Sequence, residues 1–346
     1  MDGSALPSDL PIIQAPMAGG PSTPELTASV SRAGAFGFLA SGYLPPDLLR
    51  AAITRTRELT GAPFGVNVFC PDEPSDPGPV RDYAELIGPE ADRLGVRLGE
   101  PRWDDDAFGT KLEIVVSERI QMVSFTFGCP GPGVVDELHS AGCSVVVTVT
   151  SSAEARAAEI SGADLLSLQG TEAGGHQASF LDRAPNVRPL TELLDDVRAS
   201  TAVPVVAGGG LMTGTRIAEI LHMGAVGVQL GTVFLCCPEA GTSPPYRRAL
   251  LERTYPGTML TRAFSGRFAR GLANEFAVTY SEAAPEAYPE IHHLTRPLRV
   301  AATRAGDPGI PNLWAGQGWT AVTTEPAEQL VRRLASELAR AVDTTT

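Results

Sequence analysis

The segment that decides the fold runs from Leu165 to His176 and reads LLSLQGTEAGGH. Its first five residues are mostly apolar and predict a short buried β-strand. The chain then passes through three glycines, so the backbone N–H groups of this turn are not covered by side chains. Such a turn suits an anion or a polar heterocycle, and His176 follows it directly. The alternative is a tight turn with a hydrogen-bonded histidine. The rest of the sequence is needed to choose between a binding turn and a structural one.

Seven other apolar segments resemble this strand and alternate with helical segments. The eight expected strands lie within 11–20, 36–40, 64–69, 122–128, 144–150, 165–169, 203–208 and 226–235. Strands that alternate with helices are typical of a parallel α/β fold. Eight such units favour a closed (β/α)8 barrel of the TIM type over a doubly wound sheet.

The same pattern predicts how the chain is divided. Residues 1–236 form the barrel after a loose leader at 1–10, with an enlarged third βα unit at about 70–120 that carries helices near 80–97 and 103–119. Residues 237–325 are rich in Pro and Gly and are expected to form a smaller, mostly helical add-on, placed like a lid over the barrel mouth. A closing helix is expected at about 325–343.

Composition excludes several classes of function. The chain has 346 residues and a net charge of −13, and it lacks a Lys/Arg cluster, which disfavours nucleic acid and anionic membranes as partners. No apolar run approaches the length of a membrane span, and no signal peptide is evident, so we expect a cytoplasmic protein. The five cysteines are scattered without ligand spacing, so neither a metal site nor a disulfide framework is predicted. A homodimer is left open.

Polar and glycine residues gather where the strands end, and parallel barrels carry their active sites there. Glycines after the seventh and eighth strands would bind a phosphate through backbone amides, and carboxamides would pair with the edge of a flavin ring. The pattern therefore predicts bound flavin mononucleotide (FMN). The candidates for this site at or next to the strand ends are Ala15, Met17, Asn67, Gln169, Gly174, Gly175, Gly209, Gly210, Gln229, Gly231 and Thr232.

Five short blocks in this order resemble the nitronate monooxygenases, once called 2-nitropropane dioxygenases. The blocks are QAPM at 14–17, FGVN at 64–67, QGTEAGGH at 169–176, AGGG at 207–210 and QLGT at 229–232. The resemblance covers about residues 11–235 and continues through 265–271 and 314–318. Part of the EAGGH block is also shared with flavin-dependent enoyl-ACP reductases and NAD(P)H:quinone reductases.

The resemblance implies an enzyme that uses FMN and O2 to oxidise alkyl nitronates to a carbonyl compound and nitrite, with neutral nitroalkanes as a further substrate left open. It implies that Met17 backs the flavin ring and that His176 is the catalytic residue. The chemistry of imidazole agrees, because it can donate a hydrogen bond to a nitronate anion or accept the α-proton of a nitroalkane.

Two other functions are kept as alternatives. The first is an FMN-dependent NAD(P)H reductase of enoyl-thioesters or quinones, although the loop after His176 offers only Arg183 and Arg188 for a dinucleotide. The second is a flavin or phosphate binder without catalysis. The pair Gln177-Ala178 replaces the Arg-Gly that many members of the resembled family carry, which puts the substrate preference in doubt.

Overall fold

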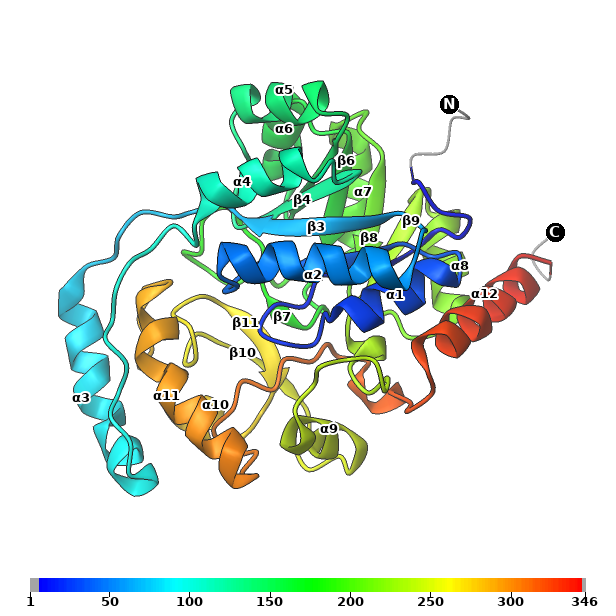
Figure 1. Ribbon diagram of the computed structural model, residues 1–346. Helices are drawn as coiled ribbons and strands as arrows, with labels where there is room; N and C mark the ends of the chain where they lie inside the picture. The colour runs from blue at the N-terminus through cyan, green and yellow to red at the C-terminus, as the bar shows by residue number, and fades with distance from the viewer. Residues whose placement is uncertain (1–5, 344–346) are drawn as a thin grey trace.

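A computed structural model describes residues 6–343 of the chain (Figure 1). Residues 1–5 of the expected leader lie outside this range. Eight parallel strands form one sheet in the order β1-β9-β8-β6-β5-β4-β3-β2. These strands are β1 (Ile12–Gln14), β2 (Gly37–Ala40), β3 (Phe64–Phe69), β4 (Met122–Thr126), β5 (Ser144–Val149), β6 (Leu165–Gln169), β8 (Val205–Gly208) and β9 (Gly227–Leu230).

The sheet closes on itself between its first and last members. A parallel bridge joins Ile13 to Phe36 just before β2, and the amide of Gln14 donates to the carbonyl of Phe36 at 2.8 Å. The predicted (β/α)8 barrel is therefore confirmed. The eighth strand is shorter than expected, because the chain turns at Gly231 into a 3₁₀ turn, η1 (Thr232–Phe234).

One helix follows each barrel strand and covers the outside of the barrel (Figure 1). Their apolar faces and the strands form one large hydrophobic core, to which the last helix contributes five buried residues. The helices are α1 (Pro24–Arg32), α2 (Pro46–Leu59), α4 (Phe108–Ser117), α5 (Pro132–Ser140), α6 (Ser152–Ser161), α7 (Leu190–Ser200), α8 (Gly214–His222) and α12 (Ala327–Asp343). None of the helices in residues 6–343 combines the length and apolarity needed to cross a bilayer.

A second body lies beside the barrel mouth. It contains α9 (Pro244–Leu251), α10 (Glu275–Tyr280), α11 (Glu290–Ala305) and the turn η2 (Trp319–Ala321). It also contains a three-stranded antiparallel sheet, β10-β11-β7, made of β10 (Thr258–Thr261), β11 (Ala269–Leu272) and β7 (Gly175–His176). The sequence indicated the helical character of this region but not its strands.

The enlarged third unit contributes to this second body. Its first helix, α3 (Pro77–Leu94), packs against α11 (Figure 1), and both helices share a hydrophobic core that is separate from that of the barrel. The helix begins earlier than expected because Asp76 caps it by accepting from the amide of Gly78 at 2.8 Å. It ends at Leu94 because Gly95 takes the left-handed conformation, with φ of 64°. Helix α4 is likewise shorter than predicted.

The closing helix gives a test of barrel packing. Leu334 of α12 is fully buried in the barrel core, so Leu334→Ala removes packed methyl groups and leaves a cavity. We expect a loss of about 2–5 kcal/mol in the free energy of unfolding, measured by urea denaturation. The control Leu48→Ala, at a half-exposed position of α2, should change stability by less than about 1 kcal/mol. Equal effects of the two substitutions would contradict the packing role of α12.

Candidate active site

Unpaired backbone amides lie at the ends of β8 and β9. Gly209 and Gly210 have φ values of 152° and 66°, which only glycine adopts readily. Within residues 6–343, the amides of Gly209, Gly210 and Gly231 donate no hydrogen bond to another residue. All three residues are half-buried, and helix α8 begins at Gly214 soon after. Buried or half-buried backbone amides normally donate a hydrogen bond to an acceptor. Three such amides without an acceptor in the protein suit a bound anion.

A segment from the C-terminal region completes this cradle, which we define as residues 172–175, 208–210, 231–232 and 315–318. The amide of Gly316 donates to Thr232 Oγ1 at 2.9 Å, and that of Gln317 donates to the carbonyl of Glu172 at 2.9 Å. A Cβ at Gly174 would lie only 2.4 Å from the nitrogen of Gly316. The two backbones therefore touch only because residue 174 is a glycine.

The sequence did not indicate that residues 315–318 belong to the site. The segment lies more than 80 residues after Thr232, and no spacing rule joins the two. The one signal was the Gly-x-Gly pattern of Gly316 and Gly318, which allows a close approach of backbones without stating which backbone is approached.

The end of β1 forms the neighbouring part of the mouth. Ala15 and Met17 lie beside Gly231, where a Cβ would meet Ala15 Cβ at 3.6 Å and Met17 Sδ at 3.8 Å. The Met17 amide donates to Ser22 Oγ at 2.8 Å, which fixes the loop after β1. Gln229 is half-buried at the end of β9. The structure thus brings the predicted residues of strands β1, β8 and β9 to one face.

The two other predicted carboxamides differ in their surroundings. Asn67 is buried, and its Nδ2 lies 3.0 Å from Ser124 Oγ and 2.9 Å from Thr126 Oγ1 on the next strand. Gln169 holds the backbone around the histidine: its Nε2 donates to the carbonyl of His176 at 2.9 Å, and its Oε1 accepts from the amide of Ala178 at 2.8 Å. The Gln169 side chain therefore positions His176, a role that the sequence did not indicate.

His176 lies in β7, where its backbone pairs with Ala269 of β11. Its Nε2 is 2.8 Å from Ser265 Oγ, and the Ser265 hydroxyl is also within 3.3 Å of the Arg267 carbonyl. Three aromatic rings stand around the imidazole, with centroid distances of 5.6 Å for Phe127, 5.9 Å for Tyr288 and 5.3 Å for Trp314. We call these three rings the aromatic cage. Neither the cage nor Ser265 was predicted, because all four residues reach His176 through tertiary contacts.

The cage is electropositive. Arg267 is buried, with its guanidinium 4.4 Å above the Phe127 ring and its ion pair to Asp72 at 3.4 Å. Arg299 bonds to Asn312 and to the carbonyl of His292, and forms no ion pair with any carboxylate in residues 6–343. Burial, together with the charges of Arg267 and Arg299, lowers the pKa of His176 from its ordinary 6.5 to about 3. The imidazole is therefore neutral at physiological pH.

Metal ligands are not grouped in this mouth. Between residues 6 and 343, no three His, Cys, Asp or Glu side chains come together in an arrangement that could hold a metal ion. What the mouth offers is a set of unpaired amides and a neutral imidazole in an aromatic, electropositive surrounding.

Comparison with known proteins places this geometry in context. A family model described as nitronate monooxygenase matches residues 5–337. A probable nitronate monooxygenase of Bacillus subtilis (strain 168) is 38% identical over 336 residues, which cover 94% of this chain and 95% of that protein.

Solved structures agree with the sequence comparison. A nitroalkane oxidase from Streptomyces ansochromogenes superposes with a TM-score of 0.96 at 46% identity, covering 98% of this chain and 99% of that one. FabK from Thermotoga maritima superposes with a TM-score of 0.76 at 28% identity, covering 99% and 96% of the two chains.

The low pKa of His176 can be observed directly. Because burial and two guanidinium groups disfavour the imidazolium, we expect the His176 ring to stay neutral from pH 8 down to pH 5. Histidine ¹⁵N NMR signals would report this, with His176→Asn used to assign the ring among the five histidines. A titration of His176 with a midpoint near 6.5 would show that the cage does not act on its charge.

Proposed function

We propose, from the premise that this chain belongs to the nitronate monooxygenase family, that it binds FMN and oxidises alkyl nitronates with O2 to a carbonyl compound and nitrite. Family membership makes the chain an oxidoreductase and implies the use of a flavin. The observation that carries the finer proposal is the neutral His176 imidazole, held in an electropositive aromatic cage at the same barrel mouth as three unpaired backbone amides.

The mouth fits FMN in two respects. The amides of Gly209, Gly210 and Gly231, which donate to no other residue within 6–343, provide donors for a phosphate. Met17 follows β1 and Gln229 lies on β9, both next to this cradle, whereas Asn67 lies across the barrel on β3. These three side chains would meet the ring edge and face. Gln169 supports the site by fixing the backbone of His176 and Ala178. When bound, FMN would accept electrons from the substrate and pass them to O2.

The chain's own residues bind and orient the substrate. Arg267 and Arg299 place positive charge near the cage, which favours the anionic nitronate over a neutral molecule. Since Ser265 contacts Nε2 of His176, the Nδ1 atom is the one left for the substrate. The Ser265 hydroxyl has one proton. When it donates to Nε2 rather than to the Arg267 carbonyl at 3.3 Å, Nδ1 carries a proton and can donate to the nitronate oxygen.

Neutral nitroalkanes would need the opposite tautomer. Ser265 would then accept from Nε2–H, and Nδ1 would take the α-proton of the substrate. An imidazole whose pKa is about 3 is a weak base, and the imidazolium would form beside two guanidinium groups. This geometry therefore supports the preformed nitronate as the better substrate.

A reductase of the FabK kind is the second candidate, because the FabK structure covers 99% of this chain. Its lower identity of 28%, against 46% for the nitroalkane oxidase, favours oxidation. The two functions differ in the electron donor, so a single anaerobic experiment separates them.

The donor test uses the FMN-loaded protein mixed anaerobically with ethylnitronate or with NADH. We expect bleaching of the flavin by the nitronate and nitrite release once O2 is added, with slow bleaching by NADH. His176→Asn should lower kcat/KM for the nitronate by about 10²- to 10⁴-fold without lowering the FMN content. Rapid bleaching by NADH with no nitrite would instead assign the reductase function.

The cradle is tested by Gly210→Ala. Alanine is strained at φ of 66°, and its Cβ would lie 3.0 Å from Glu172 Cβ. We expect the Kd for FMN, measured by quenching of flavin fluorescence, to rise at least tenfold. The matched control is Gly133→Ala in α5, where a Cβ meets no atom within 4 Å, and it should leave the Kd unchanged. An unaltered Kd in a folded Gly210→Ala protein would place the phosphate elsewhere.

A further inference from the structure

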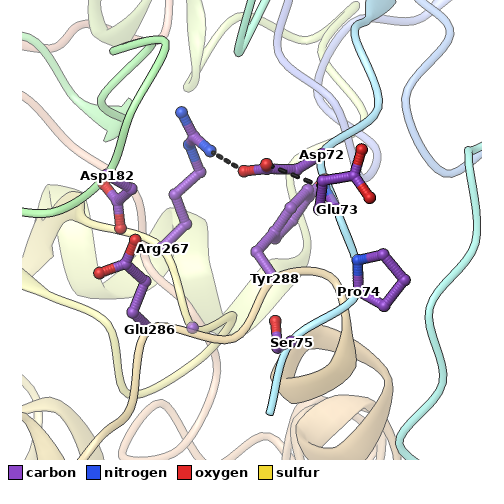
Figure 2. Close-up of a pocket in the computed structure, with 9 residues that line it drawn as sticks. Asp72, Glu73, Pro74, Ser75, Asp182, Arg267, Glu286 and Tyr288 are labelled. Atoms are coloured by element: carbon purple, nitrogen blue, oxygen red, sulfur yellow. Dashed lines mark hydrogen bonds and ion pairs between the residues drawn. The ribbon is translucent and has the colours of Figure 1, made fainter.

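A cavity of about 310 Å³ lies next to the aromatic cage but is not lined by His176. Four short segments meet around it: residues 72–75 after β3, Asp182 after β7, residues 266–267 before β11, and residues 286–288 before α11. Figure 2 shows the lining side chains, with Asp72 reaching toward Arg267 and with Tyr288 beside the 72–75 loop. We call this space the outer cavity.

Two lining residues of the outer cavity also contact the cage. The Tyr288 ring lies 5.2 Å from Phe127 and 5.9 Å from His176. The Arg267 guanidinium lies 4.4 Å from the Phe127 ring. Both side chains therefore have the outer cavity on one side and the surroundings of the imidazole on the other. Together they form the wall between the two spaces.

The Tyr288 half of this wall is held by Tyr43, which lies in the loop after β2. The Tyr288 hydroxyl donates to Tyr43 Oη at 3.1 Å, and the Tyr43 ring stacks on His292 at 4.0 Å with an interplanar angle of 6°. Tyr43 has a left-handed backbone, with φ of 66°. Its amide donates to Asp106 Oδ1 at 3.0 Å, and the other oxygen of Asp106 pairs with the buried Lys111 at 2.6 Å.

The conformation of Tyr43 is informative because a bulky residue rarely adopts it without an external constraint. Here a buried ion pair provides that constraint, and the constrained residue meets the hydroxyl of Tyr288. The wall is thus fixed by contacts from the β2 loop and the segment before α4, which are far from it in the sequence.

We propose that Tyr288 determines the substrate size of this enzyme by closing the cage against the outer cavity. The inference rests on the proposed oxidation of nitronates. With Tyr288 in place, the cage admits nitronates with short chains. Without its ring, the methylene groups of a longer nitronate occupy the space that the ring filled beside Phe127, while the nitronate group keeps its contact with His176. The end of the chain then lies in water in the outer cavity, which is made polar by Asp72, Glu73, Asp182 and Glu286.

The test measures kcat/KM for ethylnitronate and for the nitronate of 1-nitrohexane in the FMN-loaded enzyme. In Tyr288→Ala, the ratio of the long to the short substrate should rise by about tenfold or more relative to the wild type, the range expected when a pocket gains room for several methylene groups. Tyr288→Phe keeps the ring and should stay within about twofold of the wild-type ratio.

Tyr280→Ala is the matched control. This tyrosine lines a separate cavity between α3 and α10, so its loss loosens the second body without opening the cage. It should not change the ratio. If Tyr288→Ala does not fold, Tyr288→Leu serves the same test, because leucine fills part of the volume but lacks the ring. FMN content and the unfolding midpoint check each variant.

The outcomes separate this inference from the proposed function. A wild-type enzyme that releases no nitrite from either nitronate contradicts the proposed function. A wild-type enzyme that is active, with a folded, FMN-loaded Tyr288→Ala or Tyr288→Leu whose ratio is unchanged, overturns the role of Tyr288 alone. The same ratio change in Tyr280→Ala also overturns it, because general loosening would then explain the effect.

Discussion

The contact between the backbones of Gly174 and Gly316 is the constraint on which the mouth of the barrel depends. A Cβ at residue 174 would lie 2.4 Å from the nitrogen of Gly316, so no other residue type fits without moving one of the two chains. The contact fixes residues 315–318 against Thr232 on one side and the Glu172 carbonyl on the other. It also fixes the start of β7, which carries His176. The anion cradle and the catalytic candidate therefore share one structural support.

This support joins two bodies whose hydrophobic cores are separate. The strands and outer helices of the barrel share one core, whereas α3, α10 and α11 pack around a core of their own. The contacts that bridge them at the mouth include the pairing of β7 with β11 and the hydrogen bond of Ser265 with His176. Aromatic contacts add to these, with Phe127 against Tyr288 and Tyr43 stacked on His292. A side chain placed at this boundary is surrounded by protein, yet it lies between cores rather than inside one. This explains how an imidazole can lose its charge by burial while keeping one nitrogen for a ligand.

The barrel was predictable because its signals are local. Each strand is an apolar run, and caps such as Thr23, whose Oγ1 accepts from the Leu26 amide at 3.0 Å, mark where helices begin. The glycines after β8 and β9 were also visible, since their conformations depend on the glycines themselves. Strands β10 and β11 were missed because they are short and become strands through pairing with each other and with β7. Ser265 and Tyr288 were missed for a related reason, because nothing in their local sequence indicates a contact with residue 176.

Gln169 lies at the end of β6, as predicted, but its hydrogen bonds serve a role that the sequence did not indicate. Its place at the end of β6 predicted a carboxamide facing the mouth, and the structure puts it there. Both polar atoms of its side chain, however, form hydrogen bonds with the backbone around His176. The amide therefore positions the histidine. The residues proposed to bind the phosphate belong mainly to the barrel, while those around the imidazole come mainly from the second body. Because different parts of the chain build the two ends of the site, the substrate end can change by substitution in the second body without disturbing the cradle.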